Sequence, residues 1–155
     1  MEDKSQPWEA SEAEKTAARL RLKGAREAAG KDHQDLGYLV GGDSNYWDLE
    51  QCNGELFMAI DLGELVSLCT ALGIRPCDLF RDQTSNEPMI SPEELISMAE
   101  EHLKRTGLTV AEFEEVVGFE IGPALKDPTK VADWNVDFLR WLCRELGLDW
   151  GRALL

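Results

Sequence analysis

The sequence has few of the residues that build metal sites and disulfide frameworks. Its 155 residues include two histidines and four cysteines, and no two cysteines form a CxxC pair. Zinc sites need several such ligands at short, regular spacings, so we expect neither a zinc centre nor a disulfide framework. Cys69 and Cys143 fall within apolar helical patterns and are interpreted as small, buried side chains.

Long apolar runs and catalytic motifs are also missing. No apolar run approaches the ~20 residues of a membrane span, and the polar N-terminal stretch lacks the apolar segment of a signal peptide. The motifs GxGxxG, GxxxxGK[ST] and GxSxG do not occur. We therefore expect a cytoplasmic protein that has no enzyme activity, no cofactor and no membrane association.

Positive charge is scarce and unevenly distributed. The formal net charge is −14. Residues 1–31 carry seven Lys and Arg against six Asp and Glu, residues 32–90 carry two against eleven, and residues 91–155 carry seven against thirteen. An acidic surface repels nucleic-acid phosphates, so any DNA contact is expected to be confined to a small cationic patch. The other two interpretations of the charge are a generally solvated acidic surface and a basic partner.

Helix start and stop signals are abundant in the first part of the chain. Ser11 with Glu14 and Asp32 with Asp35 are spaced as capping residues, and Gly30 ends the first helix, expected over residues 12–29. Either Asp43 or Ser44 is expected to cap a short helix over 45–52. A helix over 62–72 and a final turn beginning at residue 76 complete five short helices, with no convincing strand pattern.

The second part repeats these signals. Ser91 and Thr109 are expected to cap helices that end at glycines 107 and 118, with Phe113, Val116 and Val117 facing inward. Glycine and proline interrupt residues 119–134, so at most one short helical turn is expected there before a last helix over 136–146. Residues 62–80 also match residues 136–154 at an offset of 74, with Leu, Cys and Gly at corresponding positions.

Several of these motifs are similar to one family. LKGAREAAG at residues 22–30 resembles the LRxLREAAG of Cro/C1-type (XRE) helix-turn-helix proteins, and CTALGIRPCDLF at residues 69–80 resembles their AxALGVSPxxLF. Gly30 and Gly41, like Gly107 and Gly118, are eleven residues apart, as in that family. The resemblance implies an all-α fold of two tandem lambda-repressor-like units of about five short helices each. It divides the chain into a flexible lead (1–11), a first unit (12–81), a linker (82–90) and a degenerate second unit (91–155).

The resemblance implies that the protein is a transcriptional regulator. Its first unit is expected to bind double-stranded DNA, and its second unit is expected to serve packing or homodimerisation. The segment that corresponds to the recognition helix, residues 43–51, contains no Lys or Arg. Asparagine and glutamine can read adenine, and cations can bind phosphates. The predicted DNA-contacting residues are Lys23, Arg26, Gln34, Ser44, Asn45 and Gln51. The first helix is expected to carry Lys15, Arg19, Lys23 and Arg26 on one face, and this cationic face could equally be an ordinary solvated helix side.

Two features support a second hypothesis, an acidic protein-interaction module that no longer binds DNA. The first is the acidic excess over residues 32–90, which suits a basic protein partner or a mimic of DNA. The second is the interrupted segment around residues 122–128. Aromatic residues and arginines near the C-terminus form a possible protein interface, unless the tryptophans belong to the core or a domain interface. These interface candidates are Trp134, Arg140, Trp141 and Arg144.

Overall fold

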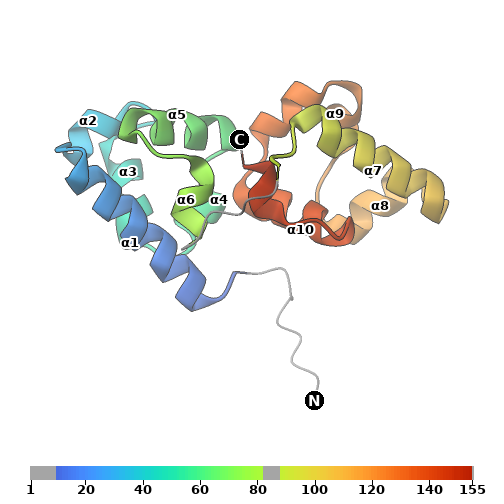
Figure 1. The fold of residues 1–155 in the computed structure, drawn as a ribbon, viewed down its shortest axis with the longest axis horizontal. Helices are drawn as coiled ribbons and strands as arrows, with labels where there is room; N and C mark the ends of the chain where they lie inside the picture. The colour runs from blue at the N-terminus through green and yellow to red at the C-terminus, as the bar shows by residue number, and fades with distance from the viewer. Residues whose placement is uncertain (1–9, 82–87, 155) are drawn as a thin grey trace, which may run out of the picture.

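The computed structural model describes residues 10–81 and 88–154, and within them the chain is all α-helical, as predicted. The helices form two groups that lie side by side (Figure 1). The first half consists of α1 (Glu12–Ala28), α2 (His33–Gly37), α3 (Asp43–Gln51), α4 (Glu55–Met58), α5 (Leu62–Leu72) and α6 (Pro76–Phe80). The second half consists of α7 (Pro92–Thr106), α8 (Val110–Val117), α9 (Gly122–Lys126), the 3-10 helix η1 (Pro128–Asp133), α10 (Val136–Glu145) and the 3-10 helix η2 (Trp150–Ala153).

Four helices begin at the capping residues expected from the sequence. The side chains of Ser11, Asp32, Ser91 and Thr109 each accept the backbone N–H of the residue three positions later. The Asp35 carboxylate returns a hydrogen bond to the backbone N–H of Asp32. Each such cap stabilises a helix by about 1 kcal/mol, so these side chains set the helix starts locally.

Three local predictions are wrong. Helix α3 begins at Asp43 directly after Gly42, so neither Asp43 nor Ser44 is its cap. Residues 119–134 form two helical pieces, α9 and η1, because Pro123 and Pro128 each occupy the first turn of a separate short helix. Val116 is 48% exposed, whereas Phe113 and Val117 on the same helix are buried. The side of α8 that packs against the core is therefore narrower than expected.

The core runs through both halves. All buried hydrophobic side chains of the described residues belong to one cluster, with members on α1 to α6 and on α7 to α10. Corresponding positions of α5 and α10 are fully buried in both helices: Leu65 and Leu139, Leu68 and Leu142, Cys69 and Cys143. The two halves therefore share a single continuous core.

Direct contacts join the halves along the middle of the molecule. Helix α5 contacts η1, α10 contacts α4, and α6 contacts η2. The backbone N–H of Leu62 donates to the carbonyl of Trp134 at 2.8 Å, and that of Ile90 donates to the carbonyl of Arg152 at 2.7 Å. Ile90 is buried, so the end of the predicted linker packs into the fold. Residues 82–87 of that linker lie outside the described residues, as do residues 1–9 of the predicted lead.

Candidate functional site

The turn between α2 and α3 brings these two helices into close contact. A Cβ atom at position 37 would lie only 2.7 Å from the Cα of Asp43, so only glycine allows this approach. Gly41 and Gly42 have φ of 89° and 141°, which side chains disfavour, and the N–H of Gly42 donates to the carbonyl of Gly37 at 2.9 Å. The glycines therefore fix the orientation of α3 relative to α2.

A buried ion pair attaches α3 to α1. The Arg26 Nε donates to Glu50 Oε2 at 2.7 Å, and its second guanidinium nitrogen donates to Glu50 Oε1 at 3.0 Å. Glu50 is 1% exposed and is the one buried charged residue of the described chain. Burial alone would raise the pKa of Glu50, but hydrogen bonds from Arg26 and the nearby positive charge outweigh it, so the pKa lies below its usual value.

The side chains of His33 and Tyr46 lie beside this ion pair. The Nε2 of His33 lies 3.8 Å from Glu50 Oε2, and the His33 ring contacts the Trp47 ring with 4.6 Å between centroids. The buried Tyr46 hydroxyl lies close to the Glu50 carboxylate but makes no hydrogen bond of standard geometry among the described residues. Burial, and then the nearby Glu50 carboxylate, raise the pKa of Tyr46 above its usual value. Polar groups thus fill the space between α1, α2 and α3.

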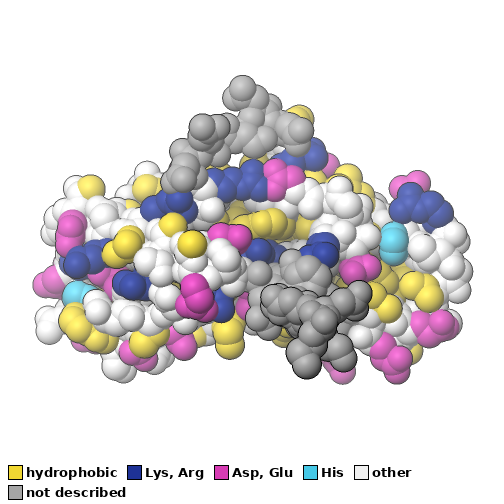
Figure 2. Space-filling model, turned by 90° about the horizontal axis from the view of Figure 1, so that it is seen from below, with side chains coloured by type: hydrophobic (Ala, Val, Ile, Leu, Met, Phe, Trp, Pro, Cys, Tyr) yellow, Lys and Arg dark blue, Asp and Glu magenta, His cyan; other side chains and the backbone are white. Residues whose placement is uncertain are grey.

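The cationic face of α1 is largely occupied by contacts within the chain. Arg19 donates to the side chain of Asn53 at 2.7 Å, Arg26 is held by Glu50, and Lys15 lies 3.6 Å from Glu12. Lys23 is exposed. On the face seen in Figure 2, Lys and Arg side chains form separate groups with acidic and hydrophobic side chains between them. A phosphate that binds Arg26 would have to compete with a buried carboxylate.

The outer surface of α2 and α3 is acidic and aromatic. We call it the α2–α3 face and define it by its exposed side chains. It includes four of the predicted DNA-contacting residues: Gln34, Ser44, Asn45 and Gln51. It also includes four carboxylates and two aromatic rings: Asp32, Asp35, Asp43, Asp48, Tyr38 and Trp47. Neither helix carries a Lys or Arg, and Tyr38 and Trp47 are 76% and 50% exposed.

A shallow cavity of about 390 Å³ opens on the α2–α3 face, between Asp32 and Gln34 on one side and Asp43, Ser44 and Trp47 on the other. The Asn45 side chain instead points back and donates to the carbonyl of Val40 at 3.1 Å. The exposed aromatic rings were not singled out from the sequence. Their position in short, mostly polar helices was the available signal, but the sequence alone does not show which side of a helix packs against the core and which side faces solvent.

The interface candidates near the C-terminus are dispersed. Trp134 is 6% exposed and stands edge-on to Phe119, while Trp141 is half-buried and Arg144 is exposed on α10. Arg140 lies between the halves, 3.3 Å from the Glu14 carboxylate. Trp134, Arg140 and Trp141 therefore take part in contacts within the chain, and an intermolecular role for the four candidates stays a prediction.

In the second half, α9 has little that resembles a DNA-reading surface. Ala124 is fully buried, and the cations Lys126 and Lys130 are exposed beside Asp127. Among the residues that the structure describes, no group of three or more His, Cys, Asp or Glu side chains could hold a metal ion. No helix within 10–81 or 88–154 has the length and hydropathy that crossing a membrane requires.

Comparison with family models, curated proteins and solved structures found no match to this chain. The resemblance to Cro/C1-type proteins thus rests on the motifs quoted above and stays a prediction.

Proposed function

We propose that this chain is a non-catalytic, cytoplasmic interaction module on a helix-turn-helix-like scaffold, and that its α2–α3 face binds a basic segment of a partner protein. The observation that carries the proposal is the composition of that face, which has four exposed aspartates, two exposed aromatic rings and no cation from either helix. Aspartates attract Lys and Arg side chains, and the faces of Tyr and Trp rings bind cations.

The contacts of Arg26 also support a protein partner over DNA. Breaking a buried, hydrogen-bonded ion pair costs several kcal/mol, so Arg26 is a poor candidate for a phosphate contact. Lys23 is then the one cation among the predicted DNA-contacting residues that can bind a phosphate. Since nucleic-acid affinity comes mainly from several cations that neutralise phosphates, one lysine amid four aspartates supplies little of it.

The test is capture of partners from a nuclease-treated lysate, followed by affinity measurements with the captured protein. We expect a basic partner whose affinity falls as salt rises. Trp47→Ala and the double variant Asp43→Asn/Asp48→Asn are each expected to weaken binding by about tenfold or more. The matched control is Glu100→Gln/Glu101→Gln, which removes the same charge from exposed positions on α7. Failure to capture a basic partner after nuclease treatment, or equal loss in the control, contradicts the proposal.

The second candidate function is transcription regulation through DNA binding by the first unit, with the second unit serving packing or homodimerisation. Exposure of Gln34, Ser44 and Gln51 on two adjoining short helices favours it, because these side chains can hydrogen-bond base edges. A mobility-shift assay on genomic fragments at low salt tests this function. Gln51→Ala and Lys23→Ala should weaken the shifted band. Arg26 is unsuitable for this test because its loss would disturb the fold.

A further inference from the structure

The two halves meet through a pattern of contacts that looks the same when the halves are exchanged. At the sequence offset of 74, α5 corresponds to α10, α4 to η1, and α6 to η2. The α5–η1 contact therefore corresponds to the α10–α4 contact, and the α6–η2 contact corresponds to itself. Asp61 caps α5 and Asn135 caps α10, and these residues are related by the offset of 74 found in the sequence. The interface therefore has two corresponding sides, one between α4 and α10 and one between η1 and α5 (Figure 1).

The side between α4 and α10 is filled with rings. Phe57 and Phe80 pack edge to face with 5.2 Å between centroids, and Phe80 packs on Trp150 at 5.4 Å. The Arg140 guanidinium lies 5.0 Å from the Trp150 ring centroid and 5.6 Å from that of Phe57. We call these four residues the aromatic cluster.

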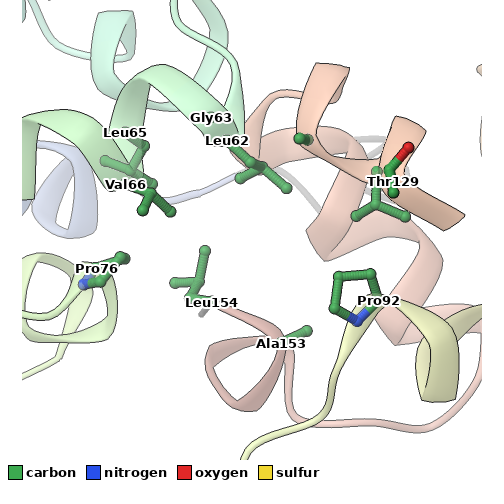
Figure 3. A pocket seen from close by; sticks show the side chains of 11 residues that line it. Leu62, Gly63, Leu65, Val66, Pro76, Pro92, Thr129, Ala153 and Leu154 are labelled. Atoms are coloured by element: carbon green, nitrogen blue, oxygen red, sulfur yellow. The ribbon is translucent and has the colours of Figure 1, made fainter.

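The side between η1 and α5 has much smaller side chains at the corresponding positions. Their counterparts at the offset of 74 are Val131 for Phe57, Leu154 for Phe80, Pro76 for Trp150 and Val66 for Arg140. All four of these residues line a cavity of about 370 Å³. In Figure 3, Val66 and Leu62 of α5 face Leu154 and Pro92 across it. The cavity thus lies where the other side of the interface holds three aromatic rings and a guanidinium.

The lining of this cavity defines the chemistry that it can accept. Among the described residues, no charged side chain lines it, and the one side-chain hydroxyl in that lining, that of Thr129, already donates to Asp127 at 2.7 Å. A charged molecule would lose its hydration without gaining a partner, whereas an apolar molecule would gain contacts with carbon atoms. Ligand pockets commonly lie between domains and begin at about 300 Å³.

We propose that this interface cavity is a binding site for a small, uncharged, ring-containing apolar molecule, which takes the place that the aromatic cluster fills on the opposite side. The proposal is independent of the α2–α3 face, since none of the cavity-lining residues belongs to α2 or α3. Because the ligand contacts α5 and α6 as well as η1 and η2, its binding also stabilises the docking of the two halves.

Toluene is the probe, and benzoate is its charged counterpart of similar shape. Titration of the full chain, followed by amide chemical shifts, should show saturable changes in α5, η1 and η2 with toluene and none with benzoate. Toluene should also raise the melting temperature, because a ligand that binds only the folded state stabilises it.

Val66→Phe places a ring at the cavity and should weaken toluene binding by at least about tenfold. Val131→Phe, which introduces the counterpart residue of the aromatic cluster, should have the same effect. Val116→Phe is the matched control, because Val116 is an exposed valine on α8, and it should bind toluene as the unaltered chain does.

Two results would overturn the proposal. The first is the absence of saturable toluene binding up to its solubility limit. The second is equal binding by the Val66→Phe, Val131→Phe and Val116→Phe variants, or equal binding of benzoate and toluene. None of these results bears on protein or DNA binding by α2 and α3, so the two proposals fail separately.

Discussion

In the first half, α3 is attached to α1 by a buried ion pair, whereas in the second half α9 is held by one carboxylate and apolar packing. Arg26 and Glu50 form two hydrogen bonds in a site closed to solvent. In the second half, Glu114 of α8 accepts the backbone N–H groups of Ile121 at 2.7 Å and Gly122 at 3.3 Å. Ala124 of α9 is fully buried in the core.

The difference shows how similarly ordered helices can be held by different chemistry. A buried ion pair requires two charged partners on separate elements, and removal of either one leaves the other uncompensated. A carboxylate that accepts backbone N–H groups needs no cationic partner. Its removal leaves neutral N–H donors without an acceptor, but no buried charge. The first half is therefore expected to be the more sensitive of the two to single substitutions and to acid.

The largest expected effect comes from breaking the ion pair. Arg26→Ala should lower the free energy of unfolding by about 3–5 kcal/mol, because Glu50 would remain charged and buried. Urea-induced unfolding followed by tryptophan fluorescence measures this loss. The double variant Arg26→Met/Glu50→Leu, which removes both charges, should lose far less. A loss below about 1 kcal/mol for Arg26→Ala would show that the pair does not hold α3.

Acid should separate the two modes of attachment. The pKa of Glu50 in the folded chain lies below its usual value, so its ionised form adds stability above the pKa of the unfolded chain, about 4.3. This contribution is lost as the pH falls from about 5 through the lower folded-state pKa. Stability measured by urea unfolding between about pH 6 and 3 should therefore decline more steeply in the unaltered chain than in Arg26→Met/Glu50→Leu. Parallel pH profiles would disprove the assignment.

A smaller effect is expected in the second half. Glu114→Ala removes the acceptor of two backbone N–H groups, one of them on the buried Ile121, and should cost about 1–3 kcal/mol. Glu115→Ala removes a carboxylate from the next, exposed position and should change stability by less than about 0.5 kcal/mol. If the two variants unfold alike, the carboxylate at position 114 does not hold α9.

Local patterns were enough to predict most helix limits. Ser11, Asp32, Ser91 and Thr109 cap their helices as expected, because each acts on a backbone N–H three residues away. Predictions that depended on helix orientation were less accurate. Val116 was expected inside and is exposed, since the side of α8 that faces the core depends on where α10 packs.

The candidate sites were less accessible to sequence analysis. The α1 cations were expected on one helix face, but their partners Glu50 and Asn53 are at least 24 residues away along the chain. The cavity between α5 and η1 depends on residues that are far apart in sequence, such as Val66 and Val131. No local pattern indicates that these side chains meet.

By itself, the sequence determined the all-α class, the helix starts and the matched positions of α5 and α10, because capping and helical periodicity act over three or four residues. Only the tertiary structure decided that Arg26 binds Glu50, that Tyr38 and Trp47 are exposed, and that the halves share one core. Those features depend on contacts between elements separated along the chain, where packing and solvent exclusion select the partners.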